Sequence, residues 1–179
     1  MYEAFYGLRQ RPFLMTADPG FLYWSNIHTL AFTMLRYGIM SRAPLTVVTG
    51  EIGSGKTTLL RHMINELPDD LVVGLVSNMQ EGRGDLLQWV MMAFGQPFDD
   101  TSYVRNFQTF QEFLIENYAA GKRTILIFDE AQNMSPSSLE ELRMLSNINA
   151  DEDQLLQIIL VGQPQLREVL SRPDLRQVV

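Results

Sequence analysis

The sequence predicts an α/β fold of three layers, in which a parallel β-sheet lies between two layers of helices. Four short apolar runs alternate along the chain with segments whose apolar residues recur at helical spacing. Apolar runs without polar alternation are typical of strands buried on both faces, and such strands occur in parallel sheets covered by helices. The four predicted strands are residues 45–49, 71–76, 124–128 and 155–161.

Residues that favour helix caps mark the ends of the predicted helices. The first helix covers residues 27–41, with either Ser25 or Asn26 as its N-cap. Asp85 precedes a helix that ends near Gly95. The other helices are predicted over 56–67, over Phe107–Ala120, from Ser135 or Pro136 to Ile148, and over 164–171.

The composition is that of a globular protein with one core. The chain has 179 residues, of which 46% are hydrophobic and 20% are charged. It contains no apolar segment long enough to span a membrane and no signal peptide, so a cytoplasmic location is expected. The absence of cysteine excludes disulfides and thiolate metal sites. The net charge of −7 argues against nucleic acid as a partner, because nonspecific binding usually requires a basic surface.

The most informative segment is the loop Gly50–Thr57, which has the pattern Gly-x-x-x-x-Gly-Lys-Thr between a predicted strand and a predicted helix. Glycines let the backbone curl so that several N–H groups point at phosphates, and the start of the helix adds the positive end of its dipole. Lys56 is expected to reach the β- and γ-phosphates, and the hydroxyl of Thr57 to bind Mg²⁺. The predicted nucleotide-binding residues are Gly50, Glu51, Ile52, Gly53, Ser54, Gly55, Lys56, Thr57 and Thr58.

An acidic pair follows the third predicted strand, where ligands bind in open α/β sheets. Asp129 is expected to hold Mg²⁺ directly or through water, and Glu130 is placed to act as the general base toward the attacking water. On its own the pair could equally be an ordinary acidic turn. After a phosphate-binding loop it becomes a strong signal for nucleotide hydrolysis.

The residues after Asp129 favour ATP over GTP as the nucleotide. Switch GTPases carry Asp-x-x-Gly at this point and a guanine-reading Asn-Lys-x-Asp later in the chain. Here Asp129 is followed by Glu130, Ala131 and Gln132, and the sequence has no Asn-Lys-x-Asp. We therefore expect ATP with Mg²⁺, and hydrolysis rather than transfer to a small substrate.

With these motifs the chain resembles the AAA+ ATPases of the general secretion pathway protein A (ExeA/GspA-like) type. It is also similar to a secretion ATPase found with exosortase and PEP-CTERM systems. The resemblance runs nearly from end to end. It is carried by the blocks Met1–Leu8, Thr49–Leu59, Phe128–Asn133, Glu141–Asn147 and Gln157–Leu166, of which the first and last are the most specific.

The resemblance implies roles for residues outside the two motifs. Gln163 matches the sensor-1 position, which contacts the γ-phosphate; the alternative is an amide that caps a helix. Arg176 and Arg172 are candidates for an arginine finger acting on a neighbouring subunit, or else are solvated side chains. Phe13 and His28 would border the adenine, although plain packing explains either of them as well.

The family likeness also implies a domain plan. Residues 1–43 form an aromatic segment and a helix that pack near the nucleotide, and residues 44–179 form the P-loop NTPase core of AAA+ type. The family continues with a fifth strand and a helical lid, both absent from this sequence. We therefore expect a truncated core with weak oligomerisation and low ATPase activity.

The expected function is ATP hydrolysis in support of the assembly or energising of a bacterial envelope secretion or export system. The implied partners are components of that system and, in a full-length protein, further copies of the chain. Other parts or partners could hold it at the inner membrane. The main alternative is a DNA-associated AAA+ regulator of the transposition type. A helicase and a non-hydrolysing nucleotide-binding scaffold are less well supported by the motifs.

Overall fold

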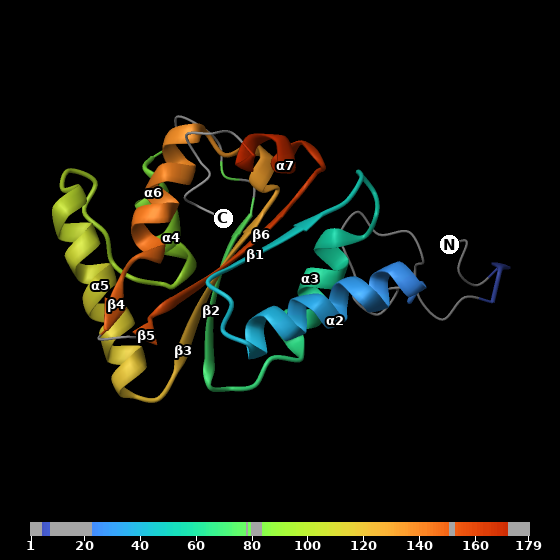
Figure 1. The fold of residues 1–179 in the computed structure, drawn as a ribbon, viewed down its shortest axis with the longest axis horizontal. Helices are drawn as coiled ribbons and strands as arrows, with labels where there is room; N and C mark the ends of the chain where they lie inside the picture. Colours follow the sequence, from blue (N-terminus) through green and yellow to red (C-terminus); the bar gives the residue numbers. More distant parts are fainter. Residues whose placement is uncertain (1–4, 8–22, 78, 80–83, 151–152, 172–179) are drawn as a thin grey trace.

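The computed structural model describes residues 5–7, 23–77, 79, 84–150 and 153–171. Within these ranges the main feature is a sheet of four parallel strands in the order β1-β6-β3-β2 (Figure 1). The last described strand therefore lies between the first and the third. The strands are β1 (Leu45–Thr49), β2 (Leu71–Ser77), β3 (Arg123–Asp129) and β6 (Leu156–Gly162).

Helices cover both faces of this sheet, and the predicted three-layered α/β fold is confirmed (Figure 1). One layer consists of α2 (Asn26–Met40) and α3 (Lys56–Asn65). The helices of the opposite layer are α4 (Leu86–Ala93), α5 (Tyr103–Ala119), α6 (Pro136–Ser146) and α7 (Gln165–Leu170). None of the helices in the described ranges combines the length and the apolar character that a membrane span requires.

The central strand β3 shows why the sequence reads as a continuous apolar run. Ile125 and Ile127 pack in the core shared with α2 and α3, whereas Leu126 and Phe128 pack in the core on the other face. All four side chains are at most 1% exposed. Successive residues of a strand point to opposite faces, so a strand covered by helices on both sides is apolar at most positions.

Capping side chains place most helix starts where the sequence predicts them. Ser25 is the N-cap of α2, which decides between Ser25 and Asn26, and Ser135 is the N-cap of α6. Each accepts an N–H from the third residue of its helix. Asp85 precedes α4 as predicted, and its own N–H donates to a glutamine side chain of that helix at 3.2 Å.

The predicted start of the fourth helix at Phe107 is wrong, because α5 already begins at Tyr103. Ser102 caps it and accepts an N–H from the first turn at 3.3 Å. The core-facing residue of this turn is polar, which hides the turn from a search for apolar spacing. That residue, Asn106, is 4% exposed and its side-chain amide binds both the N–H and the C=O of Asp99.

Two small elements are not predicted from the sequence. A short antiparallel pair, β4 (Asn149–Ala150) with β5 (Asp153–Gln154), precedes β6. A single 3₁₀ turn, η2 (Ala131–Asn133), follows the acidic pair. Both are too short to show a hydrophobic period. The turn η2 carries Gln132, whose side chain bonds to Glu130 of the acidic pair.

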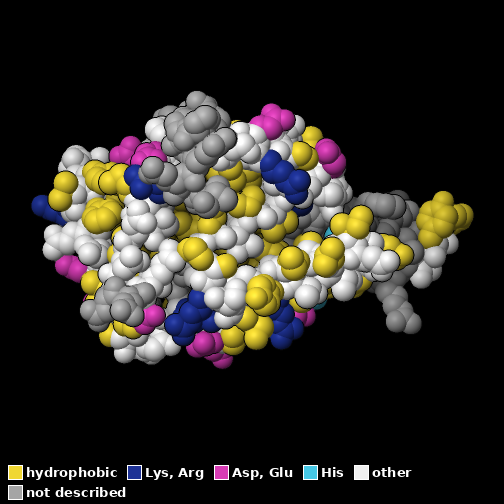
Figure 2. Space-filling view, in the orientation of Figure 1, with side chains coloured by type: hydrophobic (Ala, Val, Ile, Leu, Met, Phe, Trp, Pro, Cys, Tyr) yellow, Lys and Arg dark blue, Asp and Glu magenta, His cyan; other side chains and the backbone are white. Residues whose placement is uncertain are grey.

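The surface of α2 is unusually apolar on its outer side. Trp24, just before the helix, packs edge-on against Phe32 and His62 with ring centroids 5.3 and 5.0 Å away. The outward face of α2 nevertheless carries exposed hydrophobic side chains, and Figure 2 shows hydrophobic surface along this helix. The residues are Ile27, Leu30, Met34, Tyr37 and Met40.

A half-buried carboxyl group on α6 allows a prediction about stability. Glu141 lies beside Tyr103 and the start of α4, and burial raises the pKa of its carboxyl group. A raised folded-state pKa stabilises the fold below the unfolded-state pKa, and this contribution is lost as the pH rises through the raised value. Replacing Glu141→Gln is therefore expected to raise Tm at pH 8, with a benefit that shrinks toward pH 4. Thermal unfolding of the variant and of the unmodified chain at pH 8 and pH 4 measures the difference in Tm.

The neighbouring Glu140 provides a matched control with the opposite sign. A hydrogen bond from Arg143 lowers the pKa of the Glu140 carboxyl group. A lowered pKa favours the fold above the unfolded-state pKa, and this contribution is lost as the pH falls. Glu140→Gln should thus give no gain in Tm at pH 8. A Glu141→Gln protein that is less stable than the unmodified chain at pH 8 would contradict the assignment.

Candidate functional site

A hollow of about 340 Å³ lies at the carboxyl ends of the parallel strands. It is bordered by three segments that are far apart in the sequence: the loop after β1, the acidic turn after β3, and the end of β6. The strand order β1-β6-β3 brings these segments together at one edge of the sheet. The lining residues are Ile52, Gly53, Gly55, Lys56, Thr57, Thr58, Glu130 and Gln163.

The loop after β1 owes its shape to its glycines. Gly53 and Gly55 have φ angles of 75° and 83°, in the left-handed region that side chains disfavour. At Gly50 the constraint is space, because a Cβ atom there would lie 2.8 Å from Oγ of Ser54. The N–H of Gly50 donates to the carbonyl of Gly162 at 3.1 Å, which ties the loop to the end of β6.

Lys56 lies at the centre of this loop. Its Nζ donates to the carbonyl oxygens of Gly50 and Glu51 at 2.8 and 2.9 Å, so the ammonium group is held inside the curve of the backbone. Lys56 is also the first residue of α3, and the first N–H groups of a helix have no partner within the helix. A cation beside these free donors is an arrangement suited to an anion such as a phosphate.

The loop meets the acidic pair through a direct hydrogen bond. The hydroxyl of Thr57 donates to Oδ2 of Asp129 at 2.7 Å, across the intervening strand. The Asp129 side chain is 7% exposed, and its Oδ1 accepts the N–H of Glu130 at 3.0 Å. A hydroxyl and a carboxylate are hard oxygen ligands, so the two residues fit Mg²⁺.

A metal ion at this point would need ligands from outside the protein. Among the described residues there is no cluster of three or more carboxylates or histidines that could hold a metal by itself. Mg²⁺ typically uses one or two carboxylates together with water and phosphate oxygens. The donor set would therefore fit an ion bound together with a phosphate ligand.

Glu130 has an unusual backbone and a specific partner. Its φ and ψ angles are 60° and 38°, which is uncommon for a residue other than glycine. Its carboxylate accepts a hydrogen bond from Nε2 of Gln132 at 2.6 Å. Oε1 of Gln132 in turn accepts the backbone N–H of Gln163 at 2.9 Å. From the sequence alone, Gln132 helps only to separate nucleotide classes and is not recognised as part of the site.

His28 touches the loop from α2. Its Nε2 is 2.8 Å from the carbonyl oxygen of Ser54, and its Nδ1 is 2.7 Å from the hydroxyl of Ser25. A carbonyl can only accept, so Nε2 carries the proton and Nδ1 accepts from the Ser25 hydroxyl. The histidine therefore supports the loop backbone. The predicted adenine contact of Phe13 and the candidate fingers Arg172 and Arg176 lie outside the described residues.

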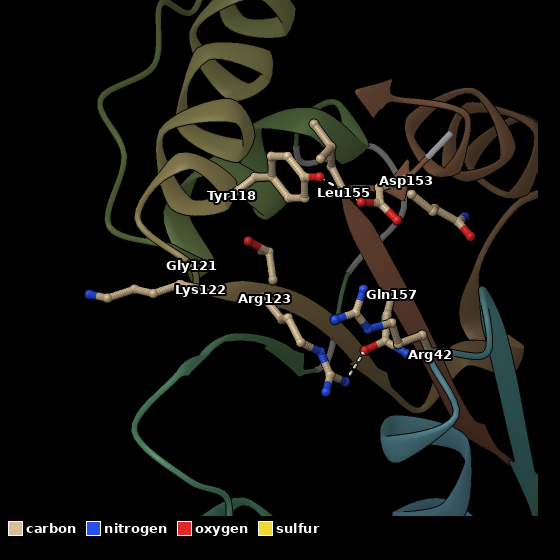
Figure 3. Close-up of a pocket in the computed structure, with 10 residues that line it drawn as sticks. Arg42, Tyr118, Gly121, Lys122, Arg123, Asp153, Leu155 and Gln157 are labelled. Carbon is tan, nitrogen blue, oxygen red and sulfur yellow. Dashed lines mark hydrogen bonds between the residues drawn. The ribbon is translucent and has the colours of Figure 1, made fainter. Parts of the chain in front are cut away.

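A second hollow of about 340 Å³ lies at the opposite edge of the sheet (Figure 3). Arg123, at the start of β3, donates to the carbonyl of Ile39 and to Oε1 of Gln157. Burial and the nearby Arg42 lower the pKa of its guanidinium group. These contacts hold the end of α2 against the sheet, and Lys122 points away from the hollow (Figure 3). We assign this second hollow a structural role and place the candidate functional site at the hollow beside the loop after β1.

The chain matches the AAA domain family over residues 39–170. It is 38% identical to general secretion pathway protein A of Aeromonas hydrophila over 179 residues. The match includes 99% of this chain and 33% of that protein, so the chain spans about a third of the relative's length. The resemblance predicted from the sequence motifs is thereby confirmed.

Solved structures confirm the fold at low sequence identity. Cdc6p from Pyrobaculum aerophilum superposes with a TM-score of 0.63 and 16% identity, over 93% of this chain and 46% of that one. The ORC2 protein of Aeropyrum pernix, solved as ADPNP–ADP complexes, gives a TM-score of 0.62 and 16% identity, over 85% and 44%. At such identity the likeness concerns the fold alone. Since the AAA domain match covers more than half of the sequence, the chain belongs to the AAA domain family.

Proposed function

We propose that this chain binds ATP with Mg²⁺ at residues 50–58 and hydrolyses it to ADP and phosphate. The observation that carries the proposal is the convergence of four chemical groups on one hollow: the ammonium of Lys56, the hydroxyl of Thr57, the carboxylate of Glu130 and the side chain of Gln163. They come from three separate segments of the chain. Each group has a distinct use in phosphoryl transfer to water.

Binding rests on the loop and the start of α3. Backbone N–H groups of the loop and of the first turn of α3, other than those of Gly50 and Ser54, which bond to carbonyl groups of the protein, donate to phosphate oxygens. Lys56 exchanges its two carbonyl partners, 2.8 and 2.9 Å away, for the β- and γ-phosphates. The proposed metal ligands are Thr57 and Asp129, and the ion they hold would neutralise charge on the phosphate oxygens. The choice of adenine rests on the sequence alone.

Hydrolysis rests on Glu130 and Gln163. Glu130 takes a proton from a water molecule as the water oxygen forms a bond to the γ-phosphorus, while the bond from that phosphorus to the β-phosphate oxygen breaks. ADP leaves with the electrons of the broken bond. Gln163 donates its side-chain amide to the γ-phosphate at the end of β6. Arg176 or Arg172 of a neighbouring copy is proposed to supply further positive charge.

The proposal for the wider role rests on the relative's name. General secretion pathway protein A is 38% identical to the chain, and its name refers to secretion. We propose that ATP hydrolysis by this chain supports the assembly or energising of a bacterial envelope secretion or export system. In that role it acts as an oligomer, in the cytoplasm or at the inner membrane through its partners.

Substitution of Lys56 tests nucleotide binding directly. Lys56→Ala removes a charge-assisted hydrogen-bond donor worth roughly 1.5–3 kcal/mol, so the Kd for ATP is expected to rise about tenfold to a hundredfold. Isothermal titration with a non-hydrolysable ATP analogue and Mg²⁺ measures this change. The chain's other lysine, Lys122, is exposed and lies at the opposite edge of the sheet, so Lys122→Ala is the matched control.

The outcome separates loop binding from adventitious binding. Equal weakening by Lys56→Ala and Lys122→Ala would show a general charge effect and would refute the assigned loop. An unmodified chain that binds the analogue but releases no phosphate from ATP would retain the binding proposal and reject hydrolysis. Release of phosphate that is lost on removal of Mg²⁺ with a chelator is the expected result.

A further inference from the structure

The side chain of Gln132 connects the acidic turn after β3 to the end of β6. Its Nε2 donates to Oε2 of Glu130 at 2.6 Å, and its Oε1 accepts the backbone N–H of Gln163 at 2.9 Å. One amide thus joins the proposed general base to the residue proposed to contact the γ-phosphate. Both of those side chains line the same hollow, whereas Gln132 does not.

The orientation of this amide is fixed by its two partners. A carboxylate can only accept a hydrogen bond and a backbone N–H can only donate one. The NH₂ group must therefore face Glu130 and the oxygen must face Gln163. If the amide were flipped, both contacts would be repulsive, so the bridge has one arrangement.

The bridge also depends on a space left by a glycine. A Cβ atom at Gly162 would lie 2.8 Å from Oε1 of Gln132 and 3.0 Å from the side chain of Leu166. Gly162 has no positive φ angle that would otherwise require glycine at this position. Its missing side chain is what allows the Gln132 amide to reach the N–H of Gln163.

A contact between residues two apart in the sequence could be only a local feature of the turn. The second contact of the same amide argues against this, because it reaches Gln163, 31 residues further along the chain. Glu130 itself has left-handed backbone angles at the start of η2. Backbone conformations of this kind persist when the surroundings hold them, and the bridge is one such restraint.

We propose that Gln132 is a positioning residue that fixes the Glu130 carboxylate relative to the end of β6. The inference rests on the proposed ATPase function and adds to it. The Gln132 amide occupies Oε2 of Glu130 and leaves Oε1 to accept the proton of the attacking water. Because the other end of the amide is held at Gln163, the base and the γ-phosphate contact keep one relative geometry.

The test is steady-state ATP hydrolysis by the 179-residue chain carrying Gln132→Leu, which keeps a side chain of similar size but removes both hydrogen bonds. We expect kcat to fall roughly tenfold to a hundredfold, as found when a partner that orients an active group is removed. The KM for ATP and the Kd of a non-hydrolysable analogue should stay unchanged, since Gln132 does not line the hollow. Gln132→Asn, whose amide is one methylene shorter, should lose kcat to a similar extent.

A matched control is available on α5. The Gln108 side chain donates to Oε1 of Glu112 at 3.0 Å on the exposed surface, so Gln108→Leu removes an amide–carboxylate bond of the same kind. It should leave kcat unchanged. Gly162→Ala should lower kcat by displacing the same amide, and adding it to Gln132→Leu should cause little further loss, because both changes break one bridge.

The outcomes separate this inference from the function on which it rests. If the unmodified chain hydrolyses ATP and Gln132→Leu has an unchanged or increased kcat, the positioning role is overturned and the proposed ATPase function stands. A parallel rise in KM and analogue Kd would also overturn it, since that pattern indicates a binding or folding defect. An unmodified chain without ATP turnover would reject the proposed function, and the positioning role with it.

Discussion

Glu130→Gln is expected to abolish most ATP turnover while leaving ATP binding intact. The substitution keeps the shape and the hydrogen-bonding reach of the side chain but removes the group that accepts the proton from water. General base catalysis typically contributes about 10²–10⁴ to the rate, so kcat should fall by about that factor. The Kd of a non-hydrolysable analogue should be retained, because phosphate binding depends on Lys56 and the loop. Phosphate release and analogue titration on the same preparation measure both quantities.

A glutamate of similar chemistry but distant position serves as the control for this change. Glu112 on α5 also accepts a hydrogen bond from a glutamine side chain, at 3.0 Å, and lies on the exposed surface away from the hollow. Glu112→Gln should leave kcat at its original value. Undiminished turnover in Glu130→Gln would show that another group takes the proton, and the proposed role of Glu130 would be withdrawn.

Phe110→Ala is expected to produce the largest loss of stability among single changes in the helical layers. The Phe110 ring is fully buried between α4 and α5, with ring centroids 5.9 Å from Phe94 and 6.2 Å from Phe113. Truncation of a buried phenylalanine costs about 3–5 kcal/mol, because it removes burial and leaves a cavity. For a chain of this length this corresponds to a fall in Tm of roughly 6–20 °C.

Thermal and denaturant unfolding measure this loss, and Phe98 provides the control. Phe98 is 44% exposed, so Phe98→Ala should cost much less. The folded fraction of the Phe110→Ala protein should still bind ATP with unchanged affinity, because α5 contributes no residue to the hollow. A Tm for Phe110→Ala close to that of Phe98→Ala would show that the core between α4 and α5 is less tightly packed than described.

The strands and the nucleotide loop are predictable from the sequence because each depends on local chemistry. Strand β3 is buried on both faces and is apolar at every position from Ile125 to Phe128. The loop requires glycine where φ is positive, at Gly53 and Gly55. The start of α5 is missed because its inward residue, Asn106, satisfies loop backbone groups and does not pack apolar surface.

The site is predicted in its parts but not in its internal connections. Lys56, Thr57, Glu130 and Gln163 border one hollow, as expected for a common site, although their roles toward ATP stay predictions. The bridge by Gln132 could not be found from the sequence. It depends on the missing Cβ of a glycine in a strand that only the folded sheet brings beside η2.

The position of β6 in the sheet has a consequence for the order of folding. β6 is synthesised after β1 and β3, yet it lies between them, and β1 and β3 are not paired with each other. During synthesis the loop after β1 and the acidic turn after β3 emerge before β6, and the strand pairing that joins β1 to β3 is completed only when β6 inserts between them. Such long-range pairing is slow and comes late in folding. We therefore expect a nascent chain to complete the proposed nucleotide site only when residues 156–162 join the sheet.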